Sequence, residues 1–287
     1  MVKNRDSDDL VAVIGLGTMG RKLVRLCLTS NLRVLAMSRS PQSEKKHLDQ
    51  IRQDLMAKVS KGQVTAELVG SMLGRIELAR SLEDLGQARF VIEAISEDVT
   101  AKRNLYRQIE PNLADNAILA TNTSSLSVTE LSKGVENRSR FVGMHFFNPP
   151  EVMKLVEVKG SKETAHDTLV KVIEMAKRLG RSPLVVPDEP GYYVNRVLFP
   201  MIVEGIRVLE SSGGNPKDID DAMRLGANLP MGPLELSDYI GNDIVLNICE
   251  ILMERTNDSR FEPPKLLTRM VLEGKLGRKS RWGFYSY

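Results

Sequence analysis

Short apolar runs rich in β-branched residues alternate with longer amphipathic stretches over the first two-thirds of the chain. The runs predict strands at 10–14, 33–37, 90–94, 117–120, 141–146 and 153–158, and the stretches between them predict helices at 18–30, 43–60, 100–109 and 163–179. Strands that alternate with helices in this way indicate a mostly parallel sheet that helices cover on both faces.

The hydrophobic pattern changes after residue 190. There the apolar positions Val194, Leu198, Met201, Ile202 and Leu209 follow a helical spacing, and prolines that come directly after capping residues predict further helix starts. The breaker-rich segment 187–191 separates the two patterns. We therefore expect an α/β domain over residues 1–187, followed by an all-α domain over residues 188–287.

The composition excludes several classes of protein. The 287 residues suffice for about two domains. With 42% hydrophobic and 27% charged residues, the chain is neither disordered nor collagen-like. The net charge is only +3 and the basic residues are spread out, so no nucleic-acid surface is indicated. No apolar run reaches the roughly 18 residues that a membrane span needs.

The cysteines and the first nine residues bear on where in the cell the protein is expected. Cys27 and Cys249 lie far apart in the sequence on apolar helical patterns, so a disulfide framework is not expected. The polar residues 1–9 lack the apolar core of a secretory signal. We expect a cytoplasmic protein without a metal site.

The first strand leads into GLGTMG at residues 15–20, a G-x-G-x-x-G turn that a helix follows. In such a turn the first glycine permits the tight bend, the second lets a pyrophosphate approach, and the third lets helix and strand pack closely. The strand, turn, helix and second strand together predict a Rossmann-type dinucleotide site. Its expected cofactor-binding residues are Gly15, Gly17, Thr18, Met19 and Gly20.

The end of the second strand bears on the choice between NAD and NADP. An acidic residue there usually holds the ribose 2′-OH of NAD. This chain has Ser38, Arg39 and Ser40 instead, and no carboxylate until Glu44. The serine hydroxyls and the guanidinium can hold a 2′-phosphate, so we favour NADP(H), with NAD(H) as the alternative. The plainer interpretation is a solvated basic loop.

A histidine and a glutamate are expected to pair across two strands. His145 ends one apolar strand, and Glu157 lies in the next one after an Asn-Pro-Pro turn. If the chain folds back about residue 151, the two residues face each other. The carboxylate would then fix the imidazole tautomer and stabilise the imidazolium, leaving the other ring nitrogen for acid–base work. A structural ion pair is the alternative. With the dinucleotide turn, the pair points to an alcohol/ketone dehydrogenase.

At this point the sequence resembles the 3-hydroxyacyl-CoA dehydrogenase family nearly from end to end. The segments that carry the resemblance are GLGTMG at 15–20, VIEAISED at 91–98, TNTSSLSVTEL at 121–131, RFVGMHFFNPPEVMKLVEV at 140–158, EPGYYVNRVLFPMIVEGIRVLE at 189–210 and DIDDAMRLGANLPMGPLELSDYIG at 218–241.

The resemblance implies roles for four catalytic positions. His145 would be the acid–base, with Glu157 as its partner. Ser124 would hydrogen-bond the 3-oxygen of the substrate, and Asn195 would help to polarise that oxygen. From the residues alone, Ser124 could equally be a helix N-cap.

Further positions follow from the same resemblance. Glu97, Lys102 and Asn122 fall where the family contacts the nicotinamide half of the cofactor, and Lys61 falls where it has a lysine near the CoA phosphates. Without the resemblance, Glu97 and Lys102 would be taken for a solvated helix face, and Asn122 equally for a helix N-cap.

The chain also departs from the family. The family usually carries an aspartate where Ser38 stands, which is our main reason for favouring NADP. Asn-Pro-Pro-Glu at 148–151 replaces Asn-Pro-Val-Pro or Asn-Pro-Ala-Pro, and Arg21 and Lys22 replace small residues after the third glycine.

We therefore expect an oxidoreductase that interconverts (S)-3-hydroxyacyl and 3-ketoacyl thioesters of short chain, such as acetoacetyl-CoA, and that forms a homodimer through its helical domains. One alternative is a related dehydrogenase that acts on a carrier-protein thioester or a free hydroxy acid. Another is a non-catalytic, crystallin-like protein that retains the fold.

Overall fold

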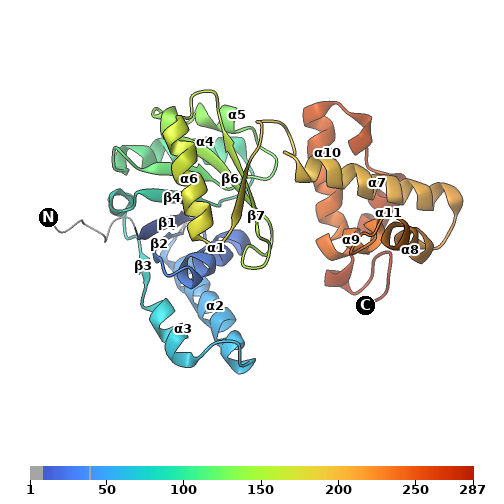
Figure 1. The fold of residues 1–287 in the computed structure, drawn as a ribbon, viewed down its shortest axis with the longest axis horizontal. Helices are drawn as coiled ribbons and strands as arrows, with labels where there is room; N and C mark the ends of the chain where they lie inside the picture. Colours follow the sequence, from blue (N-terminus) through green and yellow to red (C-terminus); the bar gives the residue numbers. More distant parts are fainter. Residues whose placement is uncertain (1–8, 39) are drawn as a thin grey trace. The chain divides into compact units, whose positions relative to one another are not determined.

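The computed structural model describes residues 9–38 and 40–287. By its internal contacts the chain divides into two compact units, Met1–Asp188 and Glu189–Tyr287. The first unit holds a sheet, and the second is built from helices (Figure 1). This confirms the predicted fold class, a mostly parallel α/β domain followed by an all-α domain.

The sheet has eight strands in the order β3-β2-β1-β4-β5-β6-β7-β8. Neighbouring strands are parallel, except that β6 and β7 are antiparallel. The strands are β1 (Leu10–Ile14), β2 (Arg33–Met37), β3 (Ile76–Leu78), β4 (Phe90–Glu93), β5 (Ile118–Thr121), β6 (Phe141–Phe146), β7 (Leu155–Gly160) and β8 (Ser182–Val185).

Helices cover both faces of this sheet. Those of the first unit are α1 (Thr18–Thr29), α2 (Pro41–Ser60), α3 (Ala66–Leu73), α4 (Val99–Ile109), α5 (Val128–Ser132) and α6 (His166–Arg178). Those of the second unit are α7 (Val194–Ser212), α8 (Pro216–Gly226), α9 (Pro233–Ile240), α10 (Asn242–Thr256) and α11 (Lys265–Leu272).

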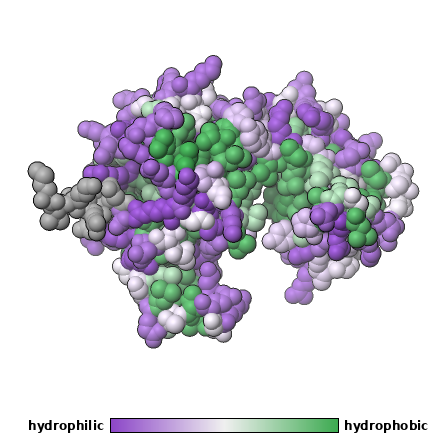
Figure 2. Space-filling model, in the orientation of Figure 1, coloured by the Kyte–Doolittle hydropathy of each residue, from purple (hydrophilic) through white to green (hydrophobic). Residues whose placement is uncertain are grey.

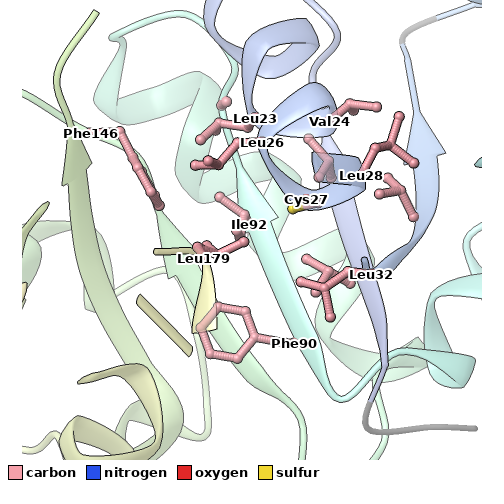
Figure 3. Close-up of a cluster of buried hydrophobic side chains, with 14 of the residues drawn as sticks. Leu23, Val24, Leu26, Cys27, Leu28, Leu32, Phe90, Ile92, Phe146 and Leu179 are labelled. Carbon is pink, nitrogen blue, oxygen red and sulfur yellow. The ribbon is translucent and has the colours of Figure 1, made fainter. Parts of the chain in front are cut away.

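Alternation along β1 explains the two layers of the core. Successive side chains of a strand point to opposite faces. Val11 and Val13 therefore join one apolar cluster, and Ala12 and Ile14 join the other. Figure 3 shows part of the first cluster, in which the apolar face of α1 packs over the sheet. Because both faces are covered, β1 is apolar throughout, as is typical of buried parallel strands.

Two edge strands were not predicted, and the structure gives the reason. β3 has only three residues, and its middle side chain, Glu77, is exposed. β8 contains Pro183 and is largely exposed. Short strands that carry a charge or a proline are typical of sheet edges, and they lack the long apolar run by which a buried strand is recognised.

The strand order positions the site. β1 pairs with β2 on one side and with β4 on the other. Strands β2 and β3 therefore extend the sheet to one side of β1, and the strands from β4 onward extend it to the other side, which makes the boundary between β1 and β4 the topological switch point. At the ends of these strands, Ile14 faces Met37 and Glu93. In open α/β sheets, ligands bind at the carboxyl ends of strands beside such a switch point.

The helical unit has its own core. It is formed by Phe199, Ile202, Val203, Ile206, Leu209, Leu234, Val245, Cys249, Leu252, Phe261 and Leu267. Asp238 accepts the backbone N–H groups of Phe284 and Tyr285 at 3.0 and 2.9 Å, which ties the C-terminal residues to α9.

Both cysteines, Cys27 and Cys249, are buried free thiols. Burial raises the pKa of the Cys27 thiol to about 12. Across the described residues, none of the helices combines the length and the apolar character that a membrane span requires.

Candidate active site

The glycine turn after β1 leaves room for a phosphate. Gly15 has φ +90°, and its N–H donates to the carbonyl of Met37 at 2.9 Å. A Cβ on Gly20 would lie 1.8 Å from the Gly15 carbonyl oxygen, so helix and strand meet without space for a side chain. A Cβ on Gly17 would meet no atom within 4 Å. The approach to the Gly17 backbone is therefore open.

The start of α1 suits an anion. Gly17 occupies the N-cap position, and no side chain caps the helix; its first turn contains no acidic residue. The backbone N–H groups at this end, together with the helix dipole, attract negative charge. Thr18 is exposed and Met19 is partly exposed beside them. The turn therefore fits the pyrophosphate of a dinucleotide.

The end of β2 carries a group of hydroxyls. Ser38 and Ser43 approach each other at 2.7 Å between their Oγ atoms, and Ser40 caps α2 by accepting the N–H of Ser43 at 3.4 Å. Ser43 was not singled out from the sequence, although its place in a capping box was a signal. The predicted contact residue Arg39 lies outside the described residues.

A carboxylate also reaches this place. The N–H of Ser38 donates to Oε1 of Glu44 at 3.4 Å. Glu44 belongs to the first turn of α2, six residues beyond Ser38, and the helical turn brings it back to the strand end. The end of β2 thus combines hydroxyl donors with one negative charge.

His145 and Glu157 face each other in the antiparallel pair of β6 and β7. His145 Nδ1 lies 2.8 Å from Glu157 Oε2. Glu157 is fully buried and His145 is 7% exposed. The predicted register and contact are both present. A buried carboxylate is costly unless it is paired, and the imidazole supplies that partner. Because Glu157 engages Nδ1, Nε2 is the ring nitrogen that an acid–base role of His145 would use.

Glu97 organises the turn after β5. Its Oε1 accepts the N–H of Ser124 at 2.7 Å, the N–H of Ser125 at 3.1 Å and the hydroxyl of Thr123 at 2.6 Å. The Ser124 hydroxyl lies 3.3 Å from the same oxygen. In the next strand, the N–H of Phe146 donates to Oδ1 of Asn122 at 3.1 Å. The structure therefore brings Glu97, Asn122 and Ser124 together beside the end of β6.

Lys102 is fully buried, and so is its partner Glu93, with 2.7 Å between Nζ and Oε1. Sequence reasoning missed Glu93. The signal was a charged residue at the end of an otherwise apolar strand, which calls for a buried partner.

Two further predicted residues belong to other parts of the chain. Asn195 is the second residue of α7 and belongs to the helical unit. Lys61 is exposed at the C-cap of α2, and this 20-residue helix separates it from Ser40 by about 30 Å.

The loop after His145 is tied to α1, which is in turn tied to α2. Lys22 Nζ donates to Asn148 Oδ1 at 2.5 Å. Arg25 is nearly buried and pairs with Glu151 at 2.7 Å and with Asp54. Glu151, where this chain departs from the family pattern, thus has a partner on α1, the helix that begins at the glycine turn.

No group of three or more His, Cys, Asp or Glu side chains in the described ranges is placed to bind a metal ion.

Comparison with known proteins agrees with this geometry. The family model described as "3-hydroxyacyl-CoA dehydrogenase, NAD binding domain" matches residues 10–189, and the one described as the C-terminal domain of the same enzymes matches residues 191–287. A 3-hydroxybutyryl-CoA dehydrogenase of Clostridioides difficile is 38% identical over 277 residues, which are 96% of this chain and 99% of that protein.

More distant relatives and solved structures are similar as well. The mitochondrial hydroxyacyl-coenzyme A dehydrogenase of Sus scrofa is 34% identical, over 96% of this chain and 90% of that protein. The crystal structure of (S)-3-hydroxybutyryl-CoA dehydrogenase from Ralstonia eutropha has a TM-score of 0.90 at 38% identity, and the match covers 98% of this chain and 99% of that one. The chain therefore belongs to the 3-hydroxyacyl-CoA dehydrogenase family, and its first unit is a nicotinamide-dinucleotide-binding domain.

Proposed function

We propose that the protein interconverts (S)-3-hydroxyacyl and 3-ketoacyl thioesters of short chain, such as 3-hydroxybutyryl-CoA and acetoacetyl-CoA, with a nicotinamide dinucleotide. The observation that carries this proposal is the His145–Glu157 pair, with 2.8 Å between Nδ1 and Oε2. His145 is the last residue but one of β6. Because β6 runs parallel to β5 and the strands before it, the pair lies at the sheet edge that also carries the glycine turn.

In the oxidative direction, His145 takes the proton of the 3-hydroxyl at Nε2. Glu157 stabilises the imidazolium that forms and fixes the tautomer that accepts the proton. When bound, the nicotinamide supplies the acceptor for the hydride that leaves C3. In the reductive direction, the imidazolium returns the proton to the oxygen of the 3-keto group, and C3 takes the hydride that a bound reduced nicotinamide would supply.

The 3-oxygen needs hydrogen-bond partners besides His145. We assign this role to Ser124 in the sheet unit and to Asn195 at the start of α7. The position of Ser124 supports its share, since Glu97 holds its backbone N–H at 2.7 Å beside the end of β6. The assignment of Asn195 rests on the family resemblance, and so does that of Lys61 to the CoA phosphates.

We propose NADP(H) as the preferred cofactor and NAD(H) as a poorer one. The hydroxyls of Ser38, Ser40 and Ser43 meet at the N-terminus of α2, where a helix dipole also favours a phosphate. No aspartate follows β2, and Arg39 adds a positive charge in the sequence. The negative charge of the Glu44 carboxylate at the same place disfavours a 2′-phosphate.

We further propose that two copies associate through the helical unit. A hollow of about 520 Å³ lies among α7, α8 and the start of α9, and its lining includes the apolar residues Met201, Val208, Ile219 and Met223. Val208 is 42% exposed. Figure 2 shows apolar residues, in green, at the surface of this unit. Light scattering on the purified chain should give the mass of a dimer.

The cytoplasmic location stays a prediction.

The proposed activity is tested by initial rates of acetoacetyl-CoA reduction with NADPH and with NADH. We expect turnover with the CoA thioester, a higher kcat/KM with NADPH, and little rate with free acetoacetate. A carrier-protein thioester that outperforms the CoA ester would move the substrate assignment to the carrier. No rate with any of these substrates would favour the non-catalytic alternative.

A further inference from the structure

Lys159 is a buried lysine on the strand that carries Glu157. Only 1% of it is exposed, and it follows Glu157 by two positions in β7. Alternate residues of a strand point to the same face of the sheet, so both side chains leave β7 on one face. Across the β6–β7 pair, Lys159 lies opposite Gly143, and Glu157 lies opposite His145. Diagonal neighbours in such a pair are about 7–8 Å apart. Lys159 is therefore a neighbour of the dyad, as we call the His145–Glu157 pair.

The ammonium of Lys159 is held in place at the end of the sheet unit. Its Nζ lies 2.7 Å from Oδ1 of Asp188, the last residue of that unit, and donates to the carbonyl of Leu126 at 3.3 Å. Asp188 in turn accepts the N–H groups of Val128 and Thr129 at 3.0 and 2.8 Å. Both charges of this ion pair therefore have defined positions.

The charged groups that face Lys159 act on one another. Burial lowers the pKa of Lys159 because the ammonium loses its hydration, and the carboxylates of Asp188, Glu157 and Glu97 act in the opposite direction. Glu97 has a second cation close to it, since its Oε2 lies 3.9 Å from Lys102 Nζ. The interaction between two charges is mutual. The Lys159 ammonium therefore favours the ionised form of Glu157 and opposes a further positive charge beside it.

Packing does not call for a charge at position 159. The residues of β7 that point to the other face, Val156 and Val158, are apolar and fully buried. Replacing a buried ion pair by apolar side chains of similar volume is often neutral or stabilising, because both charges lose their hydration on burial. An effect of the lysine charge on the neighbouring dyad gives the ion pair a role that stability does not.

We propose that Lys159 and Asp188 are positioning residues that act electrostatically on the dyad. The Lys159 ammonium opposes the protonation of His145, and so it keeps the imidazole in the neutral form that accepts the proton of the 3-hydroxyl. The Asp188 carboxylate partly balances the ammonium and moderates this effect. The inference rests on the proposed function and adds to it the groups that set the working pH range.

The first test follows the acid limb of the pH profile, which is the fall in kcat/KM towards low pH, for the oxidation of 3-hydroxybutyryl-CoA with NADP⁺. Lys159→Met removes the positive charge and should move the acid limb to higher pH by at least half a unit. Asp188→Asn leaves the ammonium unbalanced and should move the limb to lower pH. The control is Lys162→Met, at an exposed position after β7, which should leave the limb in place.

The second test needs no turnover. The chain has three histidines, and the spectrum of His145→Gln identifies the ring signals of His145. In the cofactor-free protein, the NMR titration of these signals should move to higher pH in Lys159→Met and to lower pH in Asp188→Asn. A wild-type protein inactive on the CoA thioester would refute the proposed function, and the titration would still decide whether the ion pair acts on the dyad.

The double variant separates the effect of charge from damage to the fold. Adding Asp188→Asn to Lys159→Met removes the remaining carboxylate and should bring the titration of His145 back towards lower pH. This comparison also serves if Asp188→Asn alone does not fold. Shifts of the two single variants in the same direction would overturn the inference. So would an unchanged titration in Lys159→Met, which would leave the ion pair with a structural role.

Discussion

Glu157 lies directly opposite His145 in the β6–β7 pair and holds Nδ1 of the imidazole at 2.8 Å. The two residues are twelve positions apart, and the intervening loop is anchored to α1 through Lys22 and Arg25. The orientation of the ring is therefore set by the strand register and supported by the helix that begins at the glycine turn.

Replacing Glu157 by Gln should lower kcat by about 10²-fold or more, since the amide no longer stabilises the imidazolium. The affinity for NADPH should remain unchanged, because Glu157 lies in β7 and not at the phosphate turn. Steady-state kinetics and calorimetry provide the two values. Glu174→Gln, at an exposed position on α6, is the control. A Glu157 variant with full activity would reduce the pair to a structural role.

Alanine substitutions at Gly20 and Gly17 should distinguish a role in packing from a role in dinucleotide binding. Gly20→Ala places a Cβ 1.8 Å from the Gly15 carbonyl, so it should destabilise the fold and abolish dinucleotide binding. Gly17→Ala meets no neighbour within 4 Å and should leave the urea midpoint unchanged. If the pyrophosphate approaches this backbone, the Kd of NADPH nevertheless rises at least tenfold. An unchanged Kd in Gly17→Ala would place the phosphates elsewhere.

Cofactor selectivity should respond to the charge at the end of β2. Glu44→Gln removes the carboxylate beside Ser38 and should raise the NADPH-to-NADH ratio of kcat/KM several-fold. Ser38→Asp introduces the acid that the family usually carries and should shift the ratio towards NADH by tenfold or more. The exposed Asp49→Asn, further along α2, serves as the control. Ratios that do not move in either variant would leave this loop without a role in selectivity.

The local pattern of the sequence was sufficient to predict the elements that carry the site. The glycine turn and the His145–Glu157 pair each involve neighbouring elements joined by a short connection, so spacing alone predicts their geometry. Glu93 and Lys102 could not be predicted in this way. Their contact requires α4 to fold back over the end of β4, and the Ser124 turn to lie beside both.

Glu44 was misjudged for a similar reason. Along the sequence it lies too far from the end of β2 to matter, but the first turn of α2 brings its carboxylate to the N–H of Ser38. The absence of an acid directly after a strand does not exclude a carboxylate at that place when a helix begins four residues after the strand ends.

Acid stability should depend on Asp188. This carboxylate accepts the N–H groups of Val128 and Thr129 at 3.0 and 2.8 Å, and it lies 2.7 Å from the Lys159 ammonium. Burial acts to raise the pKa of Asp188, but the hydrogen bonds from Lys159 and Thr129 outweigh it and lower that pKa to about 2.

Because the folded pKa of Asp188 is below the unfolded one, its contribution is present above about pH 4 and is lost as the pH falls through 2. The contribution is on the order of 1–2 kcal/mol. Urea midpoints of wild type and Asp188→Asn should differ most near pH 5 and should converge towards pH 3. The exposed Asp115→Asn should show no such convergence. A gap that stays constant between pH 5 and pH 3 would contradict this assignment.

The most direct test of the central claim is the rate of acetoacetyl-CoA reduction by His145→Gln, measured together with the Kd of NADPH. If His145 is the acid–base, kcat should fall by about 10²–10⁴-fold while the Kd stays within threefold of the wild-type value. Full activity in this variant would contradict the mechanism, and loss of NADPH binding would show that the substitution disturbs the cofactor site and not the proton transfer.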